Sequence, residues 1–370
     1  MARCRKARAF FMPGLPGLAG YFHPMLSAPA SLDPALLWPT VAPIATVTAP
    51  FFGLVLCGWL AARARVLPLG AIPGLNAFTL FFALPALLFR LGAGGTLAHG
   101  LSGVAMLVYG AAALLLVAGV WRLERSRPGA AADPLNAAFA ALTTAFPNSG
   151  FLGLPLLMSL LGASAAGPIA CTLLVDVFLT SSLCLALAHA AEHTGHPLQA
   201  ARDALRPVLG NPLPWSIAGG ALAGWLGVAP SGALDHGLKM LADAASPVAL
   251  FTLGAMLERA RQQPAAPASS AAVRPIGGLS LLKLVAHPAL VAGLGLLADL
   301  LGAGLPRAAW VALVLTAALP SAGNVSLLAE RHGADTGRLA RLIVVTTAAS
   351  FVSFIVIATL LHVGPPGGTP

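Results

Sequence analysis

Residues 146–157 read FPNSGFLGLPLL, and a proline inside an apolar run of this length constrains the whole architecture. Pro147, Asn148, Ser149 and Gly150 lie near the middle of an apolar stretch that runs from about residue 136 to about residue 161. Proline removes a backbone donor and clashes with the preceding turn, so a helix breaks there. In hydrocarbon the freed backbone groups are costly unless protein, water or a ligand satisfies them. The stretch therefore predicts a membrane helix that breaks at mid-depth and resumes.

A second stretch, ALPSAGNVSLLAERHG at residues 318–333, repeats this pattern later in the chain and contributes Pro320, Ser321, Gly323 and Asn324. The half-helix that resumes after each proline presents free amides and the positive end of its dipole, which favours an anion. Interrupted segments at matching positions of two halves indicate a midplane binding site. The alternative interpretation is a pair of proline kinks in which the small residues serve close helix packing. We expect the two breaks to form a substrate site.

The composition requires a membrane environment for most of the chain. Of 370 residues, 58% are hydrophobic and 9% charged, against about 45 to 50% and about 25% in soluble domains. The four cysteines form no metal or disulfide motif, and no metal is expected. Ten apolar runs of membrane-crossing length cover about residues 43–62, 72–92, 100–121, 136–161, 167–190, 209–228, 239–258, 278–300, 308–329 and 339–362.

The chain contains an internal repeat. PALLFRLGA at residues 85–93 matches PVALFTLGA at 247–255, ALTTAFPNSG at 141–150 matches VLTAALPSAG at 314–323, and GWL recurs at 58–60 and 224–226. Five helices per half make the second copy enter the membrane from the opposite side, which is typical of transporters with alternating access. The predicted fold is all-α, with ten transmembrane helices in two inverted repeats, 42–191 and 208–362, joined by a linker at 192–207 and followed by a tail at 363–370.

The distribution of basic residues predicts the orientation. Thirteen arginines follow odd-numbered spans, so by the positive-inside rule these loops and the linker are cytoplasmic and both termini are extracytoplasmic. The basic N-terminal tail conflicts with export. Three explanations stay open for residues 1–41: a signal peptide, a real extension, or a misassigned start with translation beginning at Met25, which we favour.

Three ionisable residues within predicted spans are candidates for a function inside the bilayer. Asp176 lies mid-span, where a carboxylate costs at least roughly 2.5 to 3.5 kcal/mol, so a functional role is the default. It is expected to bind a coupling H⁺ or Na⁺, or to hold a cation; the alternative is a protonated acid bonded to a neighbouring helix. Lys283 and His287 share a helix face. We expect Lys283 to snorkel to the cytoplasmic surface and His287 to be a polar packing residue; both are further candidates for ion coupling.

The two proline stretches, together with Gly210-Asn211-Pro212 and the Lys283-Leu284 and Pro288 of the eighth span, resemble the auxin efflux carrier family. Its bacterial members include malonate-transporter-like proteins. The resemblance covers about residues 42–362 and implies that helices 4 and 9 break and cross, that helices 1, 2, 6 and 7 form a scaffold, and that the others move. It implies a carboxylate site beside Pro147 and Asn148, with Pro320 and Asn211 nearby. The long hydrophilic central loop of the plant carriers is missing, which argues against auxin itself.

These observations predict a secondary carrier in a bacterial inner membrane that moves a small mono- or dicarboxylate such as malonate or malate. No Walker-type phosphate loop is present, so the expected energy source is an ion or substrate gradient and no cofactor is expected. The alternatives are an auxin-like aromatic carboxylate carrier, a channel and an intramembrane enzyme, although an aspartyl enzyme would need a second mid-span carboxylate beside Asp176. The expected partners are the anion and the lipid bilayer, with a homodimer through the scaffold helices compatible with the fold and no nucleic acid.

Overall fold

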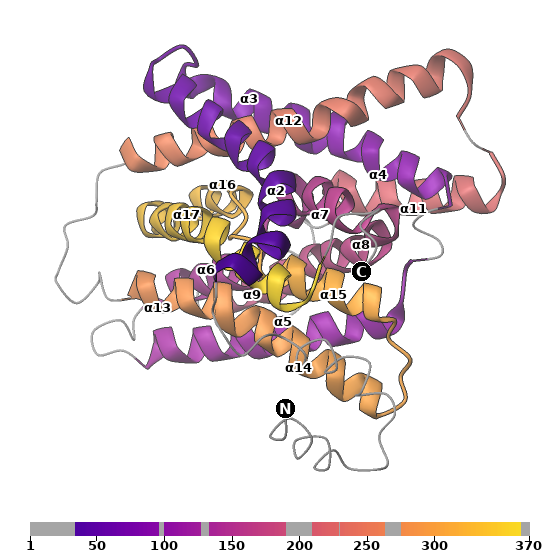
Figure 1. Ribbon diagram of the computed structural model, residues 1–370. Helices are drawn as coiled ribbons and strands as arrows, with labels where there is room; N and C mark the ends of the chain where they lie inside the picture. Colours follow the sequence, from indigo (N-terminus) through magenta and orange to yellow (C-terminus); the bar gives the residue numbers. More distant parts are fainter. Residues whose placement is uncertain are drawn as a thin grey trace.

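The computed structural model describes residues 34–95, 100–126, 133–189, 209–228, 230–262 and 275–363. Every regular element in these ranges is a helix, and no strand occurs in them (Figure 1). The predicted linker at 192–207, most of the N-terminal extension and nearly all of the tail lie outside the described residues.

Within the described ranges, the first half of the chain forms five helical segments, several of them divided by short π-helical or 3₁₀ turns. In order they are α2 (Pro34–Arg63); η2 (Leu69–Ala71), α3 (Ile72–Phe78), η3 (Thr79–Ala83) and α4 (Leu84–Ala93); α5 (Gly103–Arg125); α6 (Pro134–Ala145), η4 (Ser149–Gly153) and α7 (Leu154–Leu161); and η5 (Ala163–Ala165), α8 (Ala166–Val175), η6 (Asp176–Thr180) and α9 (Ser181–His189).

The second half also forms five helical segments. They are α11 (Pro212–Trp225); α12 (Gly232–Gln262); α13 (Pro275–Leu281), η7 (Leu282–Ala286) and α14 (His287–Leu300); α15 (Arg307–Ala317) and α16 (Asn324–Arg331); and α17 (Thr336–Leu360). Four of the short elements, η3, η4, η6 and η7, are π-helical turns, which occur frequently at functional sites.

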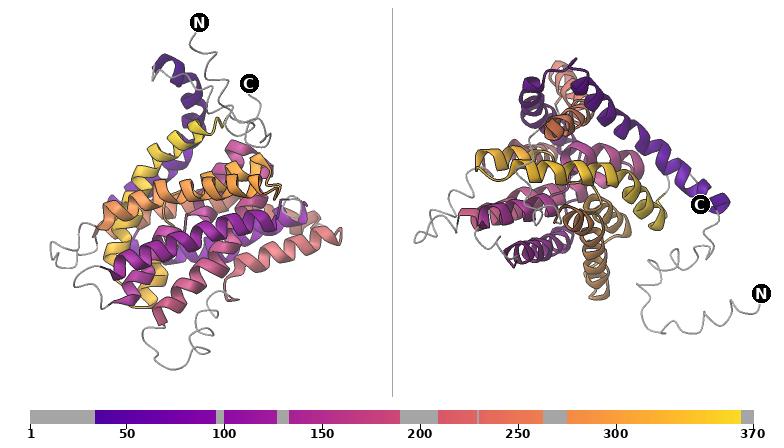
Figure 2. Two further views of the ribbon diagram at one scale, coloured as in Figure 1. Left: turned by 90° about the horizontal axis from the view of Figure 1, so that it is seen from below. Right: turned by 90° about the vertical axis from the view of Figure 1, so that its left-hand side faces the viewer.

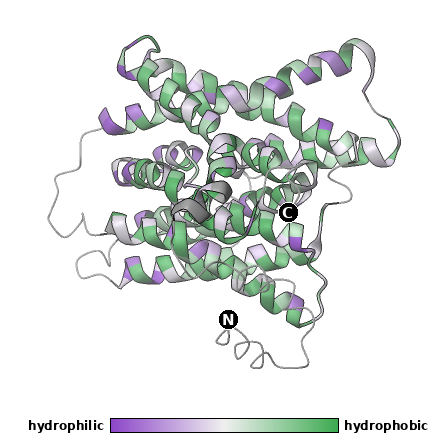
Figure 3. Ribbon diagram, viewed as in Figure 1, coloured by the Kyte–Doolittle hydropathy of each residue, from purple (hydrophilic) through white to green (hydrophobic). Residues whose placement is uncertain are grey.

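Seven of these segments in the described ranges are long and apolar enough to cross a membrane. Three of the ten predicted spans are not among them. Two are the proline-containing spans, which are divided into shorter helices, and the third is α11, which has 14 residues. Hydrophobic positions cover the middle of the bundle, and hydrophilic positions gather mostly toward the helix ends (Figure 3).

The helices form a flat group beside a larger bundle. α3, α4, α11 and α12 lie along one side of the molecule, and α5, α13 and α14 lie along the other (Figures 1 and 2). Between them lie the two helices that are interrupted at Pro147 and Pro320, together with α8, α9 and α17. α12 packs against α2, α3 and α4, and α11 packs against α4.

Glycines allow the backbones of these helices to touch. A Cβ added to Gly58 of α2 would overlap the carbonyl of Phe251 in α12, and one added to Gly254 would overlap the carbonyl of Val55. The α4–α11 pair is built in the same way, because a Cβ on Gly92 would lie 2.6 Å from the carbonyl carbon of Gly220. Small residues at close crossings are typical of helix association in membranes, where packing provides the stabilisation.

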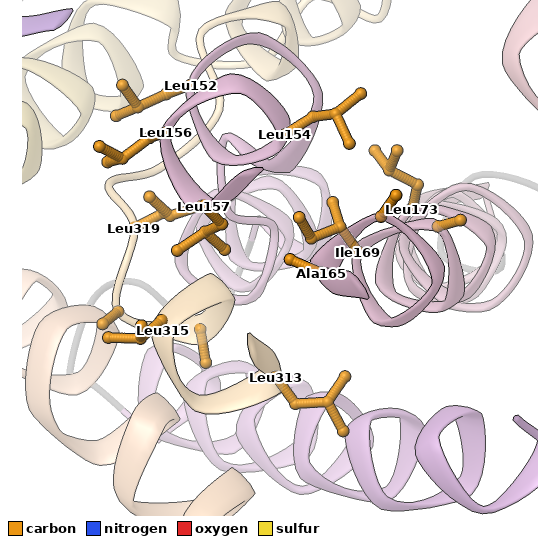
Figure 4. Close-up of a cluster of buried hydrophobic side chains, with 14 of the residues drawn as sticks. Leu152, Leu154, Leu156, Leu157, Ala165, Ile169, Leu173, Leu313, Leu315 and Leu319 are labelled. Carbon is orange, nitrogen blue, oxygen red and sulfur yellow. The ribbon is translucent and has the colours of Figure 1, made fainter. Parts of the chain in front are cut away.

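Leucine side chains pack around the two helices that are interrupted at the prolines, α6–α7 and α15–α16. Figure 4 shows Leu154 beside Ile169 and Leu173 of α8, and Leu157 beside Leu319, which precedes Pro320. Gly153 allows this approach, since a Cβ there would lie 2.6 Å from the Leu319 Cδ1. The core therefore packs around the points where the two helices are interrupted.

Candidate functional site

The two helix breaks lie against each other and exchange backbone hydrogen bonds. α6 ends at Ala145, Phe146 adopts an extended conformation, and the helix resumes at Ser149. The Asn148 N–H donates to the Pro320 carbonyl at 2.8 Å, and the Ala322 N–H donates to the Phe146 carbonyl at 3.0 Å. These bonds form an antiparallel bridge between Pro147 and Ser321. We call residues 146–149 and 320–324 the crossover. The breaks lie at the two prolines that predict them, and each break supplies partners for the other.

Several polar atoms at the crossover are buried without a partner. They are the Asn148 Nδ2, the Ser321 Oγ and the Asn324 Oδ1. Asn148 is 3% exposed and Ser321 is fully buried. A buried polar group without a hydrogen bond costs about 1 to 3 kcal/mol. Of these atoms, those of Asn148 and Asn324 belong to residues that line a cavity, so a ligand there has hydrogen-bonding groups within the protein to meet.

A cavity lies beside the crossover and is lined by most of the predicted site residues. Among its lining residues are Pro147, Asn148, Ser149, Gly150, Asn211 and Asn324. Asn211 begins α11, where its Oδ1 accepts a bond from the Leu213 N–H at 3.0 Å. That bond leaves the amide nitrogen of Asn211 for another partner. Two segments far apart in the sequence and the start of α11 thus supply side-chain amides to one cavity.

Three predicted site residues do not line this cavity. Pro320 and Ser321 lie in the backbone bridge, where the Ser321 N–H also donates to the Thr346 Oγ1 of α17 at 3.3 Å. Gly323 faces α12, and a Cβ added there would lie 3.3 Å from the Met256 Cε. These residues fix the conformation of the crossover and its distance from α12.

A second cavity adjoins the first. It shares Leu80, Phe146, Val177, Asn211 and Asn324 with it. Its remaining lining residues include Ser181 and Arg331, and among the residues that the structure describes no Asp or Glu lines either cavity. The second cavity therefore extends from residues of the crossover, Phe146 and Asn324, to a basic residue at the end of α16.

Behind the crossover lies a buried group of four polar side chains, Tyr109, Asp176, Lys283 and His287, all fully buried. The Tyr109 hydroxyl is 3.1 Å from each Asp176 carboxylate oxygen. The Lys283 Nζ is 3.0 Å from the His287 Nδ1, and Lys283 also interacts electrostatically with Asp176. The sequence hypothesis that Lys283 snorkels to the surface is wrong. Helix α13 begins at Pro275, so Lys283 lies deeper than expected and finds a carboxylate inside the bundle.

Each charge in this buried group lies at the end of a half-helix that favours its sign. The Lys283 Nζ donates to the Ala317 carbonyl at 3.1 Å, at the C-terminal end of α15. The Asp176 carboxylate interacts with Ser149, which opens η4. Cations are stabilised at helix C-termini and anions at N-termini. This buried group is thus connected with both helix breaks.

Sequence reasoning missed three residues that contribute to the site. Tyr109 is one of only two tyrosines in the chain, and a buried hydroxyl inside an apolar span signals a polar partner. Thr346 gave no such signal, because threonines in membrane helices commonly bond to their own backbone. Arg331 was assigned only to orientation, and its place beside the cavity follows from the packing of α16.

Comparison with known proteins agrees with this architecture. A family model described as Membrane transport protein matches residues 43–358. Over 332 residues the chain is 30% identical to a protein of Rhizobium meliloti (strain 1021) named "Putative malonate transporter". That match covers 88% of this chain and 98% of the relative.

Proposed function

Because the chain belongs to the membrane transport protein family, the auxin efflux carrier family that its motifs predict, we propose that it is a secondary carrier for a small organic anion. It carries the anion across the cytoplasmic membrane by alternating access. The observation that supports this most directly is the cavity at the crossover, where Asn148 presents an unpartnered side-chain amide.

The chemistry of the crossover suits a carboxylate. Side-chain amides and the first N–H groups of the resumed half-helices can donate to carboxylate oxygens, and the dipole of each half-helix adds positive potential at the same point. In the described ranges, no carboxylate lines the cavity to repel such a ligand. A short dicarboxylate of the malonate type is the proposed substrate, in accord with the name of the relative.

The proposed mechanism requires two inverted five-helix repeats. Gly58 and Gly224 occupy matching positions in the repeat, as do Gly92 and Gly254, and all four lie in close backbone contacts. The α2–α12 and α4–α11 pairs are therefore built alike. We assign these helices to the scaffold, against which the bundle containing the crossover moves as a unit between an outward-open and an inward-open arrangement.

The orientation and the energy source are part of the same proposal. Most arginines of the described ranges that follow odd-numbered spans lie at or near one end of α2, α5, α12, α16 and α17. This end faces the cytoplasm and both termini face outward. Asp176, with Lys283 and His287, responds to a coupling H⁺ or Na⁺, because it is a buried carboxylate that touches the crossover through Ser149.

Counterflow in proteoliposomes tests the proposal. Vesicles loaded with unlabelled malonate should accumulate labelled malonate transiently, which a carrier does and a pore does not. Asn148→Ala should reduce the rate at least about tenfold, the value of one lost charge-assisted hydrogen bond. Asn76→Ala is the matched control, because Asn76 is also a buried asparagine with an unpartnered side-chain oxygen but does not line the cavity.

The same assay separates the alternatives. Exchange of indole-3-acetate but not of malonate would favour an aromatic carboxylate carrier, and label loss without exchange would favour a channel. Equal rates for Asn148→Ala and the unmodified protein would exclude the crossover as the substrate site.

A further inference from the structure

Arg331 lies at the far wall of the cavity that begins at the crossover. It is the last residue of α16, and Asn324 is the first. Both residues line the same cavity. We propose that Arg331 binds the second carboxylate of the substrate and so makes the carrier selective for short dicarboxylates over monocarboxylates. This inference rests on the proposed function.

The spacing of the two residues fits a short ligand with charges at both ends. Seven residues separate them, which is about two turns or roughly 10 Å along a helix axis. Side chains on a helix lean toward its N-terminus, so the long arginine side chain leans back toward the crossover. One carboxylate held by the crossover amides leaves the other directed along α16 toward the guanidinium.

Arg331 is available for such a ligand, whereas three other arginines of the described chain pair with carboxylates. Arg259 pairs with Glu330 at 3.3 Å, Arg261 with Glu258 at 2.7 Å and Arg338 with Glu124 at 2.8 Å. In the part of the chain that the structure describes, Arg331 forms no ion pair, and its side chain is exposed. The remaining lining of the second cavity is mostly apolar, with Ser181, Asn211 and Asn324 as its other polar residues. Arg331 is therefore a cation at the edge of this cavity that no carboxylate of the described chain neutralises.

The type of cation matters as well as the charge. A guanidinium is planar and can donate two parallel hydrogen bonds to one carboxylate, whereas an ammonium acts as a point charge. We therefore expect the variant with lysine at this position to keep part of the selectivity for dicarboxylates, and the variant with glutamine to lose it.

The test compares malonate with its monomethyl ester, which has nearly the same shape and one carboxylate fewer. Competition of each compound against labelled malonate exchange is measured in proteoliposomes with the full-length protein. The unmodified carrier should prefer malonate over the ester. Arg331→Gln should lower that preference at least about tenfold, and Arg331→Lys should give an intermediate value.

Arg122→Gln is the matched control. It removes an exposed arginine near the same end of the bundle, where Glu124 of α5 pairs with Arg338 of α17, but it does not line either cavity. It should keep the wild-type preference. An equal loss in both variants would overturn the proposal, since the effect would then come from general electrostatics.

Failure of this inference can be told apart from failure of the proposed function. Unchanged preference in Arg331→Gln, with exchange still dependent on Asn148, leaves the carrier function in place and refutes the role of Arg331. Exchange of monocarboxylates alone by the unmodified carrier would also refute the role of Arg331. Absence of any carboxylate exchange in the unmodified protein overturns both.

Discussion

The backbone N–H of Asn148 donates to the carbonyl of Pro320 across 2.8 Å, although 172 positions separate the two residues in the sequence. Each proline interrupts its own helix and leaves backbone groups without helical partners. The bond joins the two interruptions, so the cost of each break is partly offset by the other. The bridge does not use the side chain of Asn148, which lines the cavity and has an amide nitrogen without a partner.

Replacing Asn148 with aspartate should abolish anion exchange. The two side chains have nearly the same size, so the backbone bridge to Pro320 persists, while the new negative charge faces the proposed carboxylate position. Exchange of labelled malonate in proteoliposomes measures the effect, and Asn148→Asp should be slower than Asn148→Ala. Aspartate faster than alanine at this position would argue against an anion beside residue 148.

Asp176→Asn should separate exchange from accumulation. A coupling residue is needed to use an ion gradient, whereas exchange of substrate for substrate needs none. We expect the variant to keep malonate counterflow and to lose uptake driven by an imposed pH or Na⁺ gradient. Measuring uptake with each gradient alone identifies the ion. Full gradient-driven accumulation in this variant would exclude Asp176 as the coupling residue.

Lys283→Met should destabilise the protein strongly. It removes the bond to the Ala317 carbonyl and leaves the Asp176 carboxylate buried without its cation. Leaving a buried charge without the opposite charge that compensates it typically costs about 3 to 5 kcal/mol. Thermal unfolding in detergent measures the loss, and the double variant Asp176→Asn/Lys283→Met should recover part of it. Additive losses in the double variant would show that the two charges do not stabilise each other.

Gly58→Ala should destabilise the α2–α12 contact, because the added methyl group would overlap the Phe251 carbonyl. Overpacking of this kind costs about 1 to 3 kcal/mol. Gly53→Ala is the matched control in the same helix, since a Cβ at Gly53 meets nothing within 4 Å. It should be neutral or slightly stabilising, because alanine favours a helix over glycine. The difference in melting temperature between the two variants checks the contact, and equal values would contradict it.

Much of the fold follows from local sequence properties. The prolines at 147 and 320 predict both breaks because their effect on a helix is local, and the apolar runs predict the long helices because length and hydropathy are local as well. The family is also predicted from motifs in the sequence, and both comparisons confirm it.

The contacts of the buried polar residues were harder to predict. Lys283 lies near a helix start in the sequence, and only the packing of α5, η6 and η7 shows that Asp176 and Tyr109 belong to the same buried group. The position of Arg331 in the cavity was also not predictable from the sequence. Its charge predicts which side of the membrane it faces, but its place in the cavity depends on how α16 resumes after the break.

The π-helical turns have a consequence for insertions and deletions. Each such turn holds one residue more than an α-helical turn, and η6 begins with Asp176 while η7 contains Lys283. Deleting a single residue inside Asp176–Thr180 could leave a continuous α-helix, so length alone does not forbid the change. A π-turn of five residues covers nearly the same rotation as four residues of an α-helix, so the two flanks would keep their facings. A deletion in an α-helical part of the same segment would instead rotate one flank against the other by about 100°. The π-turns η6 and η7 therefore mark the places where these segments can lose one residue while their flanks keep facing the same neighbours.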